Sequence, residues 1–143
     1  MTHDEGKKNE DISKADIILL GVSSTSKTPT SIYLANRGYK TLNIPLVLDQ
    51  KIPELLKKNE NKFCVIGLTA DPERLSEIRK TRANTNSNID LKLYTNVEKI
   101  REEVENSKLM FKKFRWPIID VTRRSVEETA ASIIKIYEIQ KSK

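Results

Sequence analysis

Short apolar segments alternate with longer, mostly polar segments along this chain. Four segments are rich in isoleucine, leucine and valine: Ala15–Val22, Lys40–Leu48, Phe63–Thr69 and Pro117–Thr122. Short, nearly continuous apolar runs are typical of parallel strands that are buried on both faces. Pro45 interrupts the second segment, so we expect either an edge strand there or a proline at the end of the strand.

The segments between the predicted strands carry helix signals. We expect helices over 27–37, 52–58, 72–82 and 95–114, and from 125 towards the C-terminus. Gly38 can end the first helix, and Asp71 followed by Pro72 can open the third. Thr95–Glu98 and Ser125–Glu128 have the spacing of capping boxes. Strands that alternate with helices predict an α/β fold, with a parallel sheet of about four strands and helices on both faces.

Length and composition limit the number of domains. With 143 residues, of which 37% are hydrophobic, the chain can build one core but not two. Residues 1–14 are charged and polar, with only Ile12 available for burial, so we expect a flexible arm there and one domain over 15–143. His3, the one histidine, has no other His or Cys near it, which argues against a metal site of that kind.

Charge and cysteine usage narrow the partners and the compartment. The chain carries 26 Lys and Arg against 20 Asp and Glu, a net charge of +6, which suits partners that bear phosphate. The excess is spread out and is not interleaved with aromatics, so we expect no nucleic-acid binding. Cys64, the one cysteine, lies in an apolar segment and predicts a buried structural thiol. Because no run of ~18 apolar residues and no signal peptide is found, we expect a cytoplasmic protein without a membrane partner.

The segment after the first predicted strand is the main candidate site. Gly21 is followed by four residues, then by Ser26, Lys27 and Thr28, which is the phosphate-loop pattern G-x-x-x-x-G-K-[ST] with its second glycine replaced. Such a loop presents backbone N–H groups and a helix N-terminus to phosphate oxygens. We expect Lys27 to reach the terminal phosphates and the Thr28 hydroxyl to bind Mg²⁺. Ser26 then requires a backbone without a strongly positive φ.

The predicted nucleotide-binding residues form one continuous run: Gly21, Val22, Ser23, Ser24, Thr25, Ser26, Lys27 and Thr28. The 15–143 domain would then be a P-loop nucleotide-binding domain of kinase-like fold. A plain alternative is a buried strand, a polar turn rich in serine and threonine, and a capped helix.

Two further strand ends carry groups that suit phosphate. Arg74 follows the strand that ends at Thr69, and Asp120, Arg123 and Arg124 follow the last strand. Ligands of parallel α/β sheets bind beyond the carboxyl ends of the strands, so topology brings these groups towards the loop. As an alternative, arginines 74, 79 and 82 recur at helical intervals and could form a solvated face, and Asp120 could be a structural partner of an arginine.

Several segments, in order along the chain, resemble the bacterial pyruvate, phosphate dikinase and phosphoenolpyruvate synthase regulatory protein family. The resemblance rests on Gly21–Ser31, Tyr33–Gly38, Asn43–Val47, Gly67–Thr69, Pro72–Leu75, Trp116–Pro117 and Ile119–Ala131. It implies a bifunctional enzyme, which uses ADP to phosphorylate a serine or threonine of the dikinase or synthase and uses inorganic phosphate to remove that group as pyrophosphate.

The resemblance also shows departures from the family pattern. Ser24 stands where the family has an arginine, and His3–Gly6 resembles a His-Asp-Asp-Gly segment with Glu5 substituted. Family members carry a long region before that segment. The resemblance therefore implies that this chain corresponds to the C-terminal, nucleotide-binding part, with a separately encoded N-terminal half as a candidate partner.

Phosphoryl transfer depends mainly on positioning and charge neutralisation, which suggests roles for the candidate residues. The backbone of the loop would bind the diphosphate of ADP, Lys27 the transferring phosphoryl group and Thr28 the Mg²⁺ ion. Arg74, Arg123 and Arg124 would bind the protein-bound phosphate or pyrophosphate. Asp120 would position the metal or act as base for the substrate hydroxyl.

Two alternative functions stay open at this point. The order of strands and helices, together with the arginines, also suits a small-molecule P-loop kinase of the nucleoside-monophosphate-kinase type. A truncated remnant or binding subunit, which holds nucleotide or a partner without turnover, is the alternative outside the enzyme class.

Overall fold

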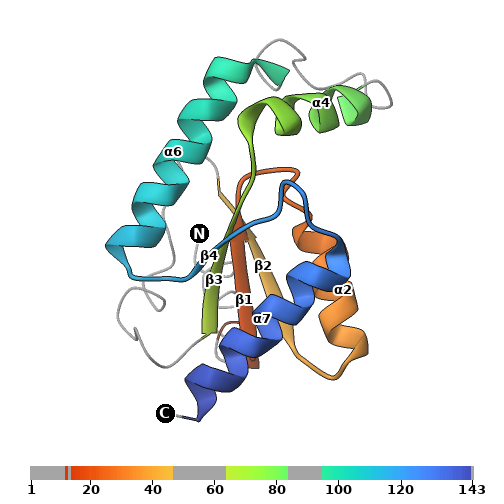
Figure 1. Ribbon diagram of the computed structural model, residues 1–143, viewed down its shortest axis with the longest axis vertical. Coiled ribbons are helices and arrows are strands. Elements are labelled where there is room, and N and C mark those ends of the chain that lie inside the picture. Colours follow the sequence, from red (N-terminus) through yellow and green to blue (C-terminus); the bar gives the residue numbers. More distant parts are fainter. Residues whose placement is uncertain (1–11, 13, 47–63, 84–94, 143) are drawn as a thin grey trace, which may run out of the picture.

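The computed structural model describes residues 12, 14–46, 64–83 and 95–142 of the chain (Figure 1). Within these ranges, the elements in order are β1 (Ile17–Gly21), α2 (Lys27–Asn36), β2 (Thr41–Pro45), β3 (Cys64–Thr69), α4 (Pro72–Ala83), α6 (Val97–Lys113), β4 (Ile118–Asp120) and α7 (Val126–Lys141). The predicted helix over 52–58 lies outside the described residues. So does nearly all of the predicted arm, but Ile12 is fully buried in the core.

The four strands form one sheet in the order β2-β1-β3-β4, and every neighbouring pair is parallel. This confirms the predicted α/β fold. Pro45 is the last residue of the edge strand β2, where its missing N–H does not interrupt the sheet. Each strand is shorter than the apolar segment that predicted it. Val22, for example, belongs to the loop that follows β1.

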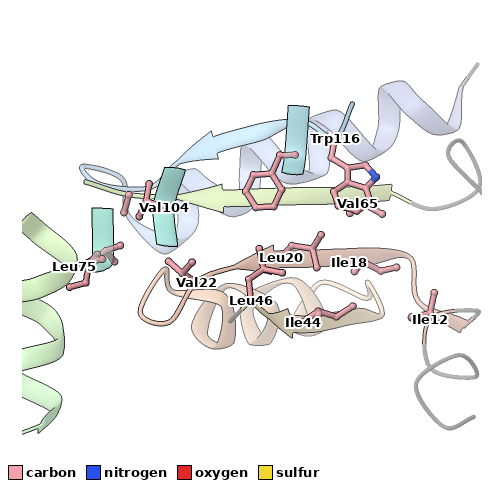
Figure 2. Packing of buried hydrophobic residues seen from close by; sticks show 13 residues of the cluster. Ile12, Ile18, Leu20, Val22, Ile44, Leu46, Val65, Leu75, Val104 and Trp116 are labelled. Atoms are coloured by element: carbon pink, nitrogen blue, oxygen red, sulfur yellow. The ribbon is translucent and has the colours of Figure 1, made fainter. Parts of the chain in front are cut away.

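Side chains of β1 and β3 alternate between two cores, one on each face of the sheet. On one face, Ile18, Leu20 and Val65 pack with residues of α4 and α6, such as Leu75, Val104 and Phe111. Figure 2 shows Leu20 and Ile18 in the same cluster as Val65 and Trp116. On the other face, the intervening strand residues pack with α2 and α7 through Ile17, Leu19, Ile66, Leu34, Ala130 and Ile133. Helices α2 and α7 lie side by side there (Figure 1).

Helix α6 approaches β3 closely because Gly67 has no side chain. A Cβ atom built at Gly67 would lie 2.4 Å from the ring of Phe111. Cys64 begins the same strand and is buried, and burial raises the pKa of its thiol to about 11. It is therefore the structural thiol that the sequence predicted.

Local signals correctly predicted three of the helix ends. The Asp71 carboxylate accepts a 3.1 Å hydrogen bond from the N–H of Arg74, and Ser125 with Glu128 forms the predicted capping box. Gly38, at φ 94°, follows α2 as its predicted stop. The expected capping box at Thr95–Glu98 is wrong, because Asn96 caps α6 by accepting the N–H of Lys99, while the carbonyl of Thr95 accepts a bond from Ser76.

Among the residues that the structure describes, no helix is both long enough and apolar enough to cross a membrane.

Candidate functional site

The loop between β1 and α2 is tightly folded around the carbonyl of Val22. This oxygen accepts hydrogen bonds from the Thr25 hydroxyl at 2.8 Å and from Lys27 Nζ at 2.9 Å. Lys27 Nζ also lies 3.3 Å from Thr25 Oγ1. A Cβ atom at Gly21 would lie 2.6 Å from Thr25 Oγ1 and 3.0 Å from the carbonyl of Leu68, so only glycine fits at that position.

Two serines of the loop have left-handed backbone conformations. Ser24 has φ 75° and Ser26 has φ 62°. The expectation that Ser26 avoids a strongly positive φ is therefore wrong. An L-residue in this region costs roughly 1–2 kcal/mol, which the surrounding loop contacts must offset. In return, residues that alternate between right- and left-handed conformations point their N–H groups into one concavity, which is a typical anion-binding arrangement.

A hollow of about 210 Å³ opens at this loop, at the carboxyl ends of β1 and β2. Its lining residues are Ser23, Ser24, Ser26, Lys27, Thr28, Pro29 and Pro45. The N–H of Leu46 donates to the carbonyl of Gly21 at 3.0 Å, which holds the end of β2 against the loop. None of the described lining residues is acidic, and pockets that enclose drug-sized ligands measure roughly 300–1,000 Å³. The hollow thus suits phosphate groups more than a whole nucleotide.

Among the described residues, Thr28 is the hydroxyl predicted to hold a magnesium ion at this site, together with the ligand's own oxygens. Thr28 is exposed in the first turn of α2, at the rim of the hollow. The described residues contain no group of three or more His, Cys, Asp or Glu that could hold a metal ion. Mg²⁺ in phosphate sites is commonly held by one or two protein oxygens, substrate phosphates and water, so the arrangement is compatible with it.

Arg79 of α4 is a buried arginine to which sequence reasoning assigned no role in the site. The alternative of a solvated arginine face is wrong for this residue, because its side chain is 1% exposed. Its guanidinium donates to Glu103 of α6 at 3.0 and 3.2 Å and to the carbonyl of Ser23 at 3.1 Å. The available signal was its position four residues after Leu75, which places both on the same, core-facing side of the helix.

The arginines predicted to bind phosphate do not line the hollow. Arg74 is exposed and its Nη1 lies 3.3 Å from Glu77 of the same helix. Arg124 donates to the hydroxyl of Ser132 at 2.9 Å, and Arg123 is exposed. The structure therefore brings together Gly21 to Thr28, whereas these three guanidinium groups lie apart from the hollow.

Asp120 is bound by the loop that follows β4. Its Oδ1 accepts hydrogen bonds from the Thr122 N–H at 2.9 Å and hydroxyl at 2.6 Å, and the same hydroxyl accepts the N–H of Asp71 at 2.8 Å. Partial burial would raise the pKa of Asp120, but the two Thr122 bonds and the charges of Lys108 and Arg124 outweigh it and lower the pKa. A carboxylate with a lowered pKa is suited to holding charge and is a weak base near neutral pH.

The fold and the loop define a class of protein: a parallel α/β domain with a hollow at the loop after its first strand, where ligands of such sheets bind. The chain belongs to the kinase/pyrophosphorylase family, whose family model matches residues 1–134. This confirms the resemblance that the sequence motifs indicated.

Curated relatives agree with the family assignment. The chain is 64% identical over 142 residues to a protein of Pelagibacter ubique (strain HTCC1062) that is named, provisionally, as a pyruvate, phosphate dikinase regulatory protein; the match covers 99% of this chain and 52% of that protein. Proteins with the same provisional name are 50% identical in Wolbachia pipientis wMel (96% of this chain, 49% of the relative) and 48% identical in Chelativorans sp. (strain BNC1) (95% and 50%). The chain thus spans about half the length of the curated relatives it matches.

Proposed function

We propose that this chain is the nucleotide-binding part of an ADP-dependent serine/threonine protein kinase that is also a phosphate-dependent phosphorylase. Its target would be pyruvate, phosphate dikinase or phosphoenolpyruvate synthase, in the cytoplasm. The observation that carries the proposal is the hollow lined by Ser23, Ser24, Ser26, Lys27 and Thr28, which has a lysine and hydroxyls but no acidic side chain among its described lining residues, in a chain of the kinase/pyrophosphorylase family.

The binding step follows from the loop. Its N–H groups and the N-terminus of α2 would donate to the diphosphate of ADP, since the two left-handed serines turn successive amides to one side. Lys27 would leave the carbonyl of Val22 and neutralise the transferring phosphoryl group. Mg²⁺ held by Thr28 would supply further charge neutralisation when bound.

The two reactions differ in acceptor. In the kinase direction the target hydroxyl forms a bond to the β-phosphorus of ADP, the bond to the bridging oxygen breaks, AMP leaves and the hydroxyl proton is released. In the phosphorylase direction an oxygen of inorganic phosphate attacks the phosphorus of the phosphoprotein, and pyrophosphate and the free hydroxyl result.

The candidate side chains outside the hollow would have two roles. The negative charge of Asp120 would position the metal, and Arg74, Arg123 and Arg124 would bind the protein-bound phosphate after reorienting towards the loop.

A second candidate function is nucleotide binding without turnover. It is favoured by the present position of two of these arginines, because Arg74 contacts Glu77 and Arg124 contacts Ser132. A separately encoded N-terminal half would then be the partner that completes the enzyme.

The test has three arms. Calorimetry of the 143-residue chain with ADP measures binding. Incubation with pyruvate, phosphate dikinase or phosphoenolpyruvate synthase, ADP and Mg²⁺ measures transfer by mass spectrometry of the target and by AMP release. Addition of phosphate to the phosphorylated target measures reversal by pyrophosphate release.

Each outcome discriminates between the candidates. Transfer to the target protein and its phosphate-dependent reversal support the bifunctional enzyme. ADP binding without transfer supports the binding subunit, and the assay is then repeated with the N-terminal half of a relative. Transfer from ATP to a nucleoside monophosphate in a parallel incubation, with no transfer to a protein, would indicate a small-molecule kinase. The absence of ADP binding would reject all three candidates.

A further inference from the structure

The buried guanidinium of Arg79 joins three elements that are distant in the sequence. It lies on α4, it pairs with Glu103 of α6, and its Nη2 donates to the backbone carbonyl of Ser23 in the loop after β1. Glu103 is 22% exposed at its side chain, so the pair is screened little by solvent. A charge-assisted hydrogen bond in such a place fixes its acceptor firmly.

The carbonyl of Ser23 and the N–H of Ser24 belong to one planar peptide group. In a trans peptide the two bonds point in opposite directions, so a contact that fixes the carbonyl also fixes the N–H. Arg79 is buried and binds the carbonyl of Ser23, whereas Ser23 and Ser24 line the hollow and Arg79 does not. The N–H of Ser24 therefore points away from the guanidinium of Arg79.

The same peptide group determines the strained backbone of Ser24. Turning the Ser23–Ser24 peptide by half a rotation would change φ of Ser24 from 75° to a negative value, which serine adopts without strain. That rotation would also put the carbonyl oxygen on the side that the N–H now occupies. Without the bond from Arg79, the relaxed orientation would therefore present an oxygen, and not an N–H, to an anion on that side.

We propose that Arg79 is a positioning residue, which holds the Ser23–Ser24 peptide in its strained orientation so that the Ser24 N–H can bind the diphosphate of ADP. The inference rests on the proposed use of the loop as the ADP site. It predicts that Arg79 affects ADP affinity only because residue 24 is not glycine, since glycine adopts positive and negative φ about equally.

A double-mutant cycle separates this role from a general contribution to packing. Arg79→Met lets the peptide turn, and a left-handed strain of the usual size corresponds to about a five- to thirtyfold loss of ADP affinity. In the Ser24→Gly background the two orientations have similar energies, so the same Arg79→Met change weakens ADP binding only about twofold. Lys80→Met, an exposed neighbour on the same helix, is the matched control and leaves the affinity unchanged.

Two outcomes overturn the proposal. Equal losses of affinity on Arg79→Met with and without the Ser24→Gly substitution would show that Arg79 acts through packing alone. A crystal structure of Arg79→Met in which Ser24 keeps its positive φ and the Ser23 carbonyl keeps its direction would do the same. If Arg79→Met does not fold, the cycle is run with Arg79→Lys, which keeps a cation beside Glu103.

Failure of the proposed function has a different signature. If the unmodified chain does not bind ADP, the site assignment is rejected, whereas the crystal structures of the Arg79 variants still decide whether this arginine holds the peptide. Conversely, ADP binding that is unaffected by Arg79→Met leaves the proposed function in place and rejects the role of Arg79.

Discussion

Lys27 Nζ donates a 2.9 Å hydrogen bond to the carbonyl of Val22, five residues earlier in the chain. The ammonium thus lies against its own loop, half-buried, between the end of β1 and the start of α2. A phosphate in the hollow would compete with the Val22 carbonyl for the three N–H donors of the Lys27 ammonium.

The first prediction concerns this lysine. Lys27→Ala removes the cation and one loop contact, so we expect at least about a tenfold loss of ADP affinity and a decrease of about 1 kcal/mol in the free energy of unfolding. Calorimetry and urea unfolding measure the two effects. Lys135→Ala, an exposed lysine on α7, is the control; full ADP affinity in the Lys27 variant would remove this residue from the site.

The second prediction concerns the contact between Gly67 and Phe111. Gly67→Ala places a methyl group at 2.4 Å from the ring, and overpacking of this kind costs about 1–3 kcal/mol of unfolding free energy. Because the clash is with one ring, Phe111→Leu in the same chain should reduce that cost by more than half. Urea unfolding of the two single variants and the double variant measures the coupling, and strictly additive effects would contradict it.

The third prediction concerns pH. Asp120 has a lowered pKa in the folded chain, so its charged form stabilises the fold above the unfolded pKa of about 4, and this contribution disappears as pH falls through the lower, folded value. Thr122→Val removes the 2.6 Å bond and should raise the pKa of Asp120. The loss of stability in this variant is therefore larger at about pH 6 than at about pH 3.

Two measurements check the pH prediction. Carboxyl NMR follows the titration of Asp120, and urea unfolding at both pH values follows the stability. Thr122→Ser keeps the hydroxyl and should titrate like the unmodified chain. An unchanged Asp120 pKa in Thr122→Val would show that the hydroxyl bond does not determine it.

The fourth prediction concerns Cys64. Burial raises its thiol pKa to about 11, so at about pH 8 the thiolate, which is the reactive form, is scarce in the folded chain. We expect a disulfide reagent to react at least about a hundredfold more slowly with the native chain than with the chain in urea, as followed by absorbance. Similar rates in both states would show that the start of β3 is accessible.

Sequence reasoning was most successful where structure depends on near neighbours. The Asp71–Pro72 start of α4, the capping box of Ser125 and the stop at Gly38 each involve groups within about four residues, so their signals can be seen in the chain itself. The capping residue of α6 was placed one position early, because both Thr95 and Asn96 are competent caps and contact with Ser76 favours the other arrangement.

The sequence predicted which loop lines the hollow beyond β1, but not the backbone conformation of that loop. The run from Gly21 to Thr28 could be located because a buried strand, a polar turn and a lysine follow one another. The left-handed backbone of Ser26 could not, because its strain is offset by the hydrogen bonds of the folded loop. The sequence also did not show that Arg74 would contact Glu77 and that Arg124 would contact Ser132, away from the residues that line the hollow.

The sequence by itself determined the alternation of strands and helices, the place of Pro45 at an edge or at a strand end, and the location of the loop that lines the hollow, since periodicity, ring geometry and capping act over a few residues. The tertiary structure alone decided that Arg79 is buried and bound to Ser23, 56 residues away, and to Glu103, 24 residues away. A charged side chain is stable inside a protein only where it forms hydrogen bonds or ion pairs. The partners of Arg79 are distant in the sequence, so these contacts form only when the helices have packed on the sheet.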